Sequence, residues 1–170
     1  MMPPIPDPDG DAARTELSIR RATPADADAV SEITDLAYAR YLPLLGRKPQ
    51  PMTADHRAMI VDHQVWLLAQ GGRSLAILEL IDEPGCTLIY SVAVRPEVQK
   101  RGLGRRLLAW AERQASRAGH ERIRLYTNAR MEDNLRLYAR LGYAETDREP
   151  YQGSTLIHMA KALPRDEPLP

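Results

Sequence analysis

The sequence predicts an α/β (α+β) protein in which helices lie on the faces of one mixed β-sheet. Three observations predict it. Apolar, strand-like runs fill residues 65–94, and the turn signals Gly71-Gly72 and Pro84-Gly85 divide them into an antiparallel meander of three strands. After Pro96 the apolar residues change to helical spacing. Strand-like and helix-like segments then alternate, so the expected order is β-α-α-β-β-β-α-β-α-β-β.

The chain is expected to begin with a short strand and a helix. Residues 17–23 carry the strand pattern, and the helix follows directly. Thr23 is the expected N-cap and Pro24 suits the first helical position, where no backbone N–H is needed. The helical spacing is carried by Ala29, Val30, Ile33, Leu36 and Ala37.

A proline-rich loop and a second helix come next. Residues 42–52 hold three prolines and are therefore expected to be a loop. Residues 53–63 have a helical pattern, with Thr53 or Asp55 as the N-cap. The three strands of the meander follow this helix.

The last third alternates between helix and strand. Apolar residues recur through residues 103–118 at helical spacing, and Gly119 is the expected stop. The remaining elements are a strand at 122–127, a helix at 132–142 closed by Gly142, and two strands within 143–163 that meet at Gln152-Gly153.

Length and composition indicate one globular domain at residues 16–163, between flexible Pro-rich tails at 1–15 and 164–170. The formal net charge is zero, which argues against nucleic acid or an anionic membrane as a partner. No apolar run approaches the length of a membrane helix. The one cysteine, Cys86, allows no disulfide within the chain, so we expect a cytoplasmic protein in which Cys86 is a packing residue or, as the alternative, a reactive thiol.

A glycine-rich basic turn, "QKRGLGR" at residues 99–105, joins the meander to the long helix. The first four N–H groups of a helix have no partner within it, and the helix dipole adds about half a positive charge there. Glycines let an anion approach the backbone closely, because they carry no Cβ atom. This turn therefore predicts a phosphate-binding site. We predict no metal ligands in this sequence.

Other phosphate-binding turns fit the same residues poorly. A P-loop needs a Lys followed by Ser or Thr after its last glycine, and the segment lacks both the spacing and the hydroxyl. In a dinucleotide fold, Leu107 would occupy the position of a third glycine. A plain strand-to-helix connection with a solvated basic face is the alternative without function.

The segment "VAVRPEVQKRGLGRRLL" resembles the pyrophosphate-binding motif of the GNAT superfamily of acetyl-CoA-dependent N-acetyltransferases, Q/R-x-x-G-x-G/A after a strand ending in V-x-P. A second segment, "NLRLYARLGY" at 134–143, is similar to that family's L-Y-x-x-x-G-F/Y. With the element order, the resemblance covers about 85% of the chain. It implies a mostly antiparallel sheet flanked by helices and splayed between the fourth and fifth strands.

The resemblance also implies which residues bind acetyl-CoA, the co-substrate. Backbone groups of the strand before the turn would pair with pantetheine, and amides of the turn would hold the pyrophosphate. The family often has Asn where this chain has Met131, so Asn134 is the candidate to supply that contact from the adjacent turn; its alternative role is a helix N-cap. The cofactor-binding residues implied are Val92, Ala93, Val94, Gln99, Lys100, Arg101, Gly102, Leu103, Gly104, Arg105, Asn134 and Tyr138.

The catalytic residues are a general acid and a general base. Tyr138 stands at the family's Tyr position, so the resemblance implies that it protonates the leaving thiolate; the alternative is a core residue. The amide of Val94 is the implied donor to the oxyanion. No motif fixes the base: Glu79 is the candidate, its alternative being a solvent-facing side chain, and a water chain is a further alternative. His56 and His63 are expected on the surface.

The expected function is transfer of an acetyl group from acetyl-CoA to a primary amine, on a small molecule or a peptide, directly within a ternary complex. The protein is expected to act as a monomer or homodimer. The rival function is a CoA-binding sensor that no longer turns over. The acceptor site is expected among the first two helices, their loop and the hairpin at residues 148–154, with Tyr38, Tyr41, Pro51, Met52 and Trp66 either lining it or packing the loop.

Overall fold

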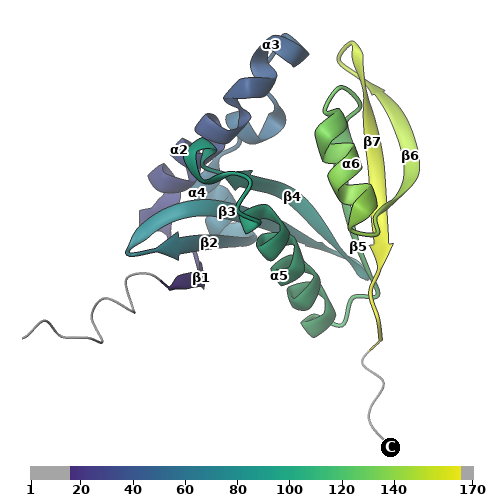
Figure 1. The fold of residues 1–170 in the computed structure, drawn as a ribbon. Coiled ribbons are helices and arrows are strands. Elements are labelled where there is room, and N and C mark those ends of the chain that lie inside the picture. Colours follow the sequence, from purple (N-terminus) through teal and green to yellow (C-terminus); the bar gives the residue numbers. More distant parts are fainter. Residues whose placement is uncertain (1–15, 166–170) are drawn as a thin grey trace, which may run out of the picture.

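The fold is one seven-stranded sheet with helices on both faces, seen in a computed structural model that describes residues 16–165 (Figure 1). The strand order is β1-β2-β3-β4-β5-β7-β6, and only β4 and β5 run parallel. The tails predicted at 1–15 and 164–170 lie outside the described residues except for the first two residues of the second. The strands are β1 (Leu17–Arg21), β2 (Gln64–Gln70), β3 (Arg73–Glu83), β4 (Cys86–Val94), β5 (Arg122–Asn128), β6 (Ala144–Tyr151) and β7 (Ser154–Ala162).

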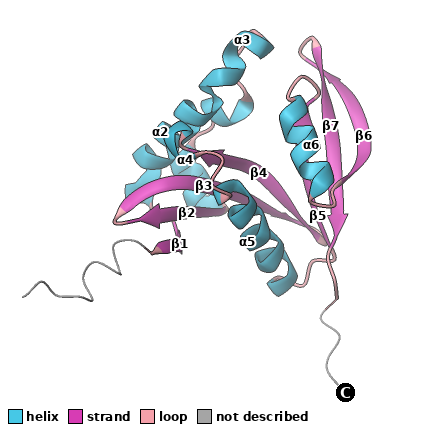
Figure 2. Cartoon of the chain, in the orientation of Figure 1, coloured by secondary structure: helices cyan, strands magenta, loops and turns pink. Residues whose placement is uncertain are grey.

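The helices divide between the two faces of the sheet (Figure 2). Residues of α2 and α4 pack on one face, against β2, β3 and β4, and α5 packs on the other. The α-helices are α2 (Ala27–Tyr38), α3 (Leu42–Leu45), α4 (His56–Asp62), α5 (Leu103–Arg117) and α6 (Glu132–Arg140). Four short 3-10 helices are η1 (Pro24–Asp26), η2 (Ala39–Tyr41), η3 (Gln50–Thr53) and η4 (Pro96–Val98).

The predicted class and element order are confirmed, with one correction in the proline-rich segment. Residues 42–52 were expected to be a loop, but they contain α3 and the start of η3. Both are only four residues long, and each carries a proline within its first two positions, where a helix tolerates proline. The choice between Thr53 and Asp55 as cap of α4 is also decided, because the Asp55 carboxylate accepts the Ala58 N–H at 3.0 Å.

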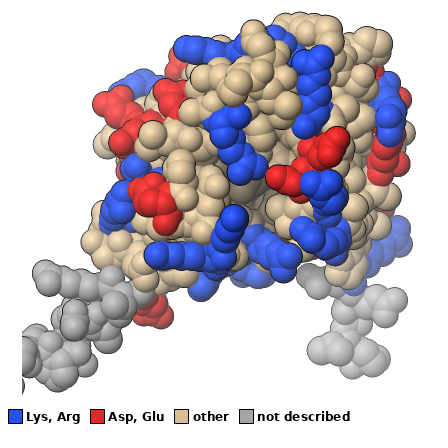
Figure 3. Space-filling model, turned by 45° about the horizontal axis from the view of Figure 1, so that its top comes forward, with Lys and Arg blue, Asp and Glu red and all other residues tan. Residues whose placement is uncertain are grey.

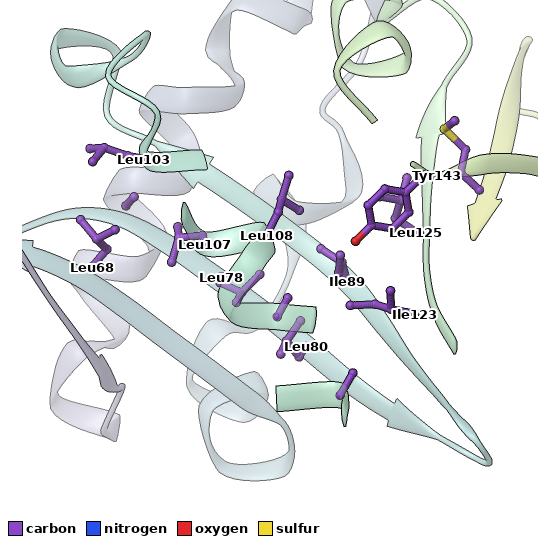
Figure 4. Packing of buried hydrophobic residues seen from close by; sticks show 14 of the residues in the cluster. Leu68, Leu78, Leu80, Ile89, Leu103, Leu107, Leu108, Ile123, Leu125 and Tyr143 are labelled. Atoms are coloured by element: carbon purple, nitrogen blue, oxygen red, sulfur yellow. The ribbon is translucent and has the colours of Figure 1, made fainter. Parts of the chain in front are cut away.

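The larger core lies between α5 and the sheet. The helix turns an apolar stripe that includes Leu107 and Ala111 toward the strands, and both side chains are fully buried. Figure 4 labels the central members of this cluster: Leu68, Leu78, Leu80, Ile89, Leu103, Leu107, Leu108, Ile123, Leu125 and Tyr143. Cys86 is buried at the start of β4, as a packing residue would be. Because α5 is held so firmly, its N-terminus has a fixed position relative to the end of β4.

Among the described residues, no helix is long and apolar enough to cross a membrane. The same residues contain no cluster of three or more His, Cys, Asp or Glu side chains placed to hold a metal ion.

Candidate active site

A gap opens in the sheet between β4 and β5. The two strands pair from Cys86 opposite Arg122 to Ile89 opposite Leu125, and β4 continues to Val94 without that partner. This is the splay predicted between the fourth and fifth strands. Figure 1 shows the two strands separating toward the end at which α3 and α6 lie.

Two backbone units of β4 face this gap. The Arg95 N–H donates to the Leu75 carbonyl on β3 at 2.9 Å. In an antiparallel ladder, successive residues direct their N–H and C=O groups to opposite sides, so Val94 and Val92 are directed away from β3, into the gap. Ala93 is directed toward β3. Of the three strand residues predicted to touch the cofactor through the main chain, two are therefore placed to do so.

The turn after β4 presents backbone amides at the start of α5. The first intrahelical bond runs from the Arg106 N–H to the Gly102 carbonyl, at 3.0 Å, so the amides of Leu103, Gly104 and Arg105 precede it. Gly102 has a φ of 78°, in the region that favours glycine, and sharply bends the chain into the helix. The Gln99 side chain donates to the Val94 carbonyl at 3.1 Å and closes the turn against the strand.

Gly104 is not required by packing within the protein. A Cβ atom added there would meet the Val94 Cγ2 atom at 3.9 Å, an ordinary van der Waals contact. Its open side faces a large groove, which we call the cofactor groove. The fold itself does not need a glycine at this position. Beside free amides and facing a groove, a glycine allows a ligand to approach the backbone closely.

The cofactor groove holds about 1460 Å³ of unfilled space, its open mouth included. It runs along the end of β4, the turn, the start of α5 and one side of α6. Every residue predicted to bind the cofactor lines it except Arg101. Five cations line it as well, and Figure 3 shows Lys and Arg side chains gathered around a hollow on this part of the surface. These cations are Arg40, Lys100, Arg105, Arg136 and Arg140.

A second, smaller cavity of about 700 Å³ lies on the other side of the gap, and we call it the acceptor cavity. Its walls come from the middle of β4, from β5, from the segment 45–51 and from the β6–β7 hairpin. Five of the seven tyrosines of the chain line it: Tyr38, Tyr90, Tyr126, Tyr138 and Tyr151. Gln50 ties its walls together, because its amide accepts from the Tyr126 hydroxyl at 3.0 Å and donates to the Tyr151 hydroxyl at 3.1 Å.

The cofactor groove and the acceptor cavity meet at four residues, Tyr38, Val92, Asn134 and Tyr138, which line both. Burial raises the pKa of Tyr138 to about 12, with a smaller contribution from Tyr41. Its phenol is therefore protonated at neutral pH and can act as a proton donor. The Tyr138 ring also packs edge-on against Tyr143, at 6.0 Å between centroids. The half-buried side chain thus reaches the meeting point from a position packed against the core.

Glu79 and His56 form a buried pair, which corrects two sequence-based expectations. Glu79 is 0% exposed, so the alternative of a solvent-facing side chain is wrong. His56 was expected on the surface and is only 6% exposed, because α4 packs it down onto the sheet. The His56 Nδ1 atom lies 2.7 Å from the Glu79 Oε1 atom. His63 stays partly exposed at the end of α4.

The second Glu79 oxygen, Oε2, is buried and has no hydrogen-bond partner among the described residues. Glu79 stands opposite Ser91 in the β3–β4 ladder, so the two side chains lie on the same face. The Ser91 hydroxyl lies 3.2 Å from the Tyr38 hydroxyl, and both Ser91 and Tyr38 line the acceptor cavity. Glu79 is therefore one side chain behind the cavity wall and has an acceptor atom free.

We expect the pair to make stability depend on pH. Burial lowers the pKa of His56, but the hydrogen bond and charge of Glu79 and the Pro51 backbone outweigh it, so the net pKa is raised. A pKa raised above the unfolded value of about 6.5 means that protonated His56 stabilises the folded state. That contribution is complete below about pH 6.5 and is lost as pH rises through the folded-state pKa. In urea unfolding, the stability difference between wild type and His56→Gln should therefore shrink from pH 6 to pH 9. An equal difference at both values would contradict the assignment.

The structure excludes one alternative for Asn134 and one for Trp66. Asn134 is not an N-cap, because α6 begins at Glu132 and Met131 precedes it. Its Oδ1 atom accepts from the Tyr41 hydroxyl at 3.4 Å. Trp66 was considered for the amine pocket, but it packs edge-on against Trp110 of α5, at 5.2 Å between centroids, and does not line the acceptor cavity.

Several lining residues of the acceptor cavity were missed from the sequence, notably Arg47, Gln50, Tyr90 and Tyr126. Arg47 and Gln50 lie in the loop that was expected to border the acceptor site, and Tyr90 and Tyr126 lie on strands without a motif, so nothing local singles out the individual residues. One usable signal existed. Tyr90 is the one aromatic residue in the strand that leads into the V-x-P segment.

Known proteins match this chain in sequence and in fold. A profile of the acetyltransferase (GNAT) family matches residues 30–143. The aminoalkylphosphonate N-acetyltransferase of Salmonella typhimurium strain LT2 is 40% identical over 58 residues, which is 34% of this chain and 38% of that relative. The chain thus matches well under half of that relative's length.

Solved structures share the whole fold at low identity. The PaiA N-acetyltransferase of Thermoplasma acidophilum, solved in complex with coenzyme A, has a TM-score of 0.74 at 17% identity over 87% of this chain and 99% of its own. The ribosomal-protein-S18-alanine N-acetyltransferase of Escherichia coli has a TM-score of 0.71 at 21% identity, over 87% and 94%. The YncA acetyltransferase of Salmonella typhimurium, solved with acetyl-CoA, has a TM-score of 0.69 at 20% identity, over 92% and 99%.

Proposed function

Because the chain belongs to the acetyltransferase (GNAT) family, we propose that it moves an acetyl group from acetyl-CoA to a primary amine by direct transfer within a ternary complex. One observation carries the proposal: the cofactor groove and the acceptor cavity meet at Val92 and Tyr138. A thioester reaching this point from the groove would face an amine held in the cavity. Direct attack needs the two reacting atoms within about 3–3.5 Å, which two separate sites sharing one opening can provide.

The residues present fit coenzyme A. The amides of Leu103, Gly104 and Arg105 are free to hold the diphosphate, and Lys100 and Arg105 line the same part of the groove. Val92 and Val94 direct backbone groups into the gap, where an extended pantetheine arm pairs with them as an added strand would. When bound, acetyl-CoA supplies the activated acetyl group and a thiol leaving group.

We assign the oxyanion donor to the backbone N–H of Val92 rather than to that of Val94. Both face the gap, but only Val92 lines both cavities, whereas Val94 lies next to the turn that holds the diphosphate. A backbone amide in a fixed strand stabilises the negative charge that develops on the carbonyl oxygen without having to reorient.

Tyr138 is the proposed general acid. Burial raises the pKa of Tyr138 to about 12, so its phenol carries a proton at neutral pH when the thiolate departs. It donates its proton as charge develops on sulfur, so coenzyme A leaves as a neutral thiol, and the phenolate regains a proton from the nitrogen of the tetrahedral intermediate as that nitrogen becomes the amide.

Glu79 is the proposed general base. An alkylammonium has a pKa near 10, so it must lose a proton before its nitrogen can attack. The free Oε2 atom of Glu79 accepts that proton through a water molecule that bridges it to the Ser91 and Tyr38 hydroxyls. His56 positions the carboxylate by holding its other oxygen.

The name of the Salmonella relative supports an amine acceptor, since an aminoalkylphosphonate carries one. The proposal is tested by following free thiol released from acetyl-CoA in the presence of a panel of primary amines. Acetyl-CoA-dependent thiol release with matching N-acetyl product is the expected result. Binding of acetyl-CoA without turnover on any amine would instead favour a sensor.

Tyr138→Phe should lower kcat by about 100-fold or more, because it removes the phenolic proton but keeps the ring in the core. The dissociation constant for coenzyme A, measured by calorimetry, should change little. Tyr143→Phe is the matched control: its hydroxyl bonds the Glu112 carboxylate at 3.2 Å, and it lines neither cavity. If the two variants have equal kcat, Tyr138 is a packing residue.

A further inference from the structure

The acceptor cavity carries one formal charge, and it is positive. Among the described residues that line it, Arg47 is the only ionisable side chain other than tyrosine, and no Asp or Glu is present. Burial raises the pKa of Tyr90 to about 12, and burial also raises the pKa of Tyr126, so these hydroxyls stay neutral at physiological pH. The cavity is therefore cationic for any ligand that enters it.

Arg47 is held at the cavity without a counter-ion. It follows Gly46, which ends α3 in a left-handed conformation with a φ of 69°. The guanidinium lies 4.8 Å over the ring of Tyr151, and one terminal nitrogen makes a long contact of 3.5 Å to the Tyr151 carbonyl. No carboxylate of residues 16–165 forms an ion pair with it.

The Nε–H donor of Arg47 is buried and has no hydrogen-bond partner among the described residues. A buried donor of a charged group without a partner is unusual, because native proteins satisfy such groups. Stacking on Tyr151 holds the guanidinium plane in place, and its fork of donors matches the geometry of a carboxylate or phosphate. Both observations point to an anionic partner that the protein itself does not supply.

We propose that the acceptor is an amine that also carries an anionic group, a carboxylate, phosphonate or phosphate, and that Arg47 binds this group. The inference rests on the proposed acetyl transfer and adds the class of acceptor. The amine end lies at the meeting point with the cofactor groove, beside Tyr138, and the anionic end lies toward segment 45–51 and the β6–β7 hairpin. A diamine is disfavoured, because its second ammonium would meet no carboxylate in the lining and would face Arg47.

The test compares amines that differ only in the charge of the far end. 3-Aminopropanoate, 4-aminobutanoate and 2-aminoethylphosphonate are paired with 3-aminopropanol, 4-aminobutanol and 2-aminoethanol, and 1,4-diaminobutane is added. At least one anionic amine should exceed its neutral partner in kcat/KM by roughly 10- to 100-fold, as expected for a charge-assisted hydrogen bond. The carboxylate and phosphonate arms identify which anion is preferred. If the alcohols or the diamine are used as well as the anionic amines, the inference is overturned while the acetyltransferase function stands.

Variants at Arg47 separate recognition from structure. Arg47→Met should remove the preference for anionic amines and leave kcat/KM for their neutral partners within about twofold, while Arg47→Lys should restore part of the preference. Arg130→Met is the matched control: Arg130 is exposed at the same end of the molecule, contacts the Leu44 and Gly153 carbonyls at 3.4 Å, and does not line the cavity. An equal loss for charged and neutral amines in Arg47→Met would show a structural role and overturn the inference.

A binding measurement tests the inference even if the protein acetylates none of these amines. That lack of turnover would count against the proposed function itself. N-acetyl-3-aminopropanoate and N-acetyl-3-aminopropanol are titrated into the wild-type protein saturated with coenzyme A. The wild type should bind the carboxylate at least 10-fold more tightly than the alcohol, and Arg47→Met should bind the two equally. Equal affinities in the wild type would overturn the inference without any reference to turnover.

Discussion

Gly104→Leu is expected to abolish coenzyme A binding without lowering the thermal stability of the protein. The side chain would point into the cofactor groove, where we propose that the diphosphate binds beside the amides of Leu103 and Arg105. The fold itself offers room, since the nearest atom to an added Cβ is Val94 Cγ2 at 3.9 Å. Leucine in place of glycine also favours the helix by roughly 0.5–1 kcal/mol, so Tm should hold or rise.

Gly104→Ala is the matched control. It gains the same helix propensity but adds only one carbon, and the family pattern that the turn resembles accepts Ala at this position. Calorimetric titration with coenzyme A should give near wild-type affinity for Ala and no measurable binding for Leu, with both proteins at or above the wild-type Tm. Gly102 is a poorer site for this test, because its φ of 78° strains any other residue and confounds binding with folding. If Gly104→Leu binds coenzyme A with wild-type affinity, the diphosphate does not bind at this turn.

The cofactor half of the site could be predicted because it is local in sequence. Much of the groove is lined by consecutive elements: the end of β4, the turn and the start of α5. A few adjacent residues there place free amides beside glycine, which is a pattern that can be recognised in the sequence. Every predicted cofactor residue but Arg101 accordingly lines one groove.

The backbone roles within β4 needed the structure. Which strand residues face the gap depends on the register between β3 and β4, and a one-residue shift would exchange Ala93 for its neighbours. The ladder contains an irregularity between Glu79 and Leu80, which no sequence pattern announces. The pairing shows that Val92 and Val94 face the gap, and the lining of the two cavities then distinguishes Val92, which borders both, from Val94.

The acceptor half is assembled from distant segments, so the sequence indicated the loop after the first helix and the hairpin at 148–154 but not which of their residues come together. Arg47 and Tyr151 are 104 residues apart, and Gln50 and Tyr126 are 76 apart. The pair of His56 and Glu79 joins a helix to a strand across 23 residues. Glu79 was predicted from the sequence because it is a carboxylate within an apolar strand. The prediction that His56 lies on the surface was wrong, because the sequence of a short polar helix does not indicate which of its faces packs against the sheet.

Glu79→Gln is expected to lower kcat by about 100-fold or more while coenzyme A binds as before, since the amide cannot accept the proton of the amine. The substitution keeps the size of the side chain and an oxygen that can accept from His56, so the fold is retained. The buried position makes this carboxylate unlike any other on β3. Glu83→Gln is the matched control, because Glu83 lies on the same strand but pairs with Arg124, at 2.6 Å, away from both cavities.

The pH dependence of the Glu79→Gln variant separates a base from a residue that only shapes the cavity. Without Glu79 the reaction depends on amine that is already neutral, and an amine of pKa near 10 supplies about tenfold more of it for each pH unit between 7 and 9. The rate of the variant should therefore rise steeply over this range, and the deficit relative to wild type should narrow. A merely structural role would leave a deficit of constant size at every pH, because lost packing does not depend on the protonation of the amine. Turnover equal to wild type at pH 7 would mean that another group, or water alone, removes the proton.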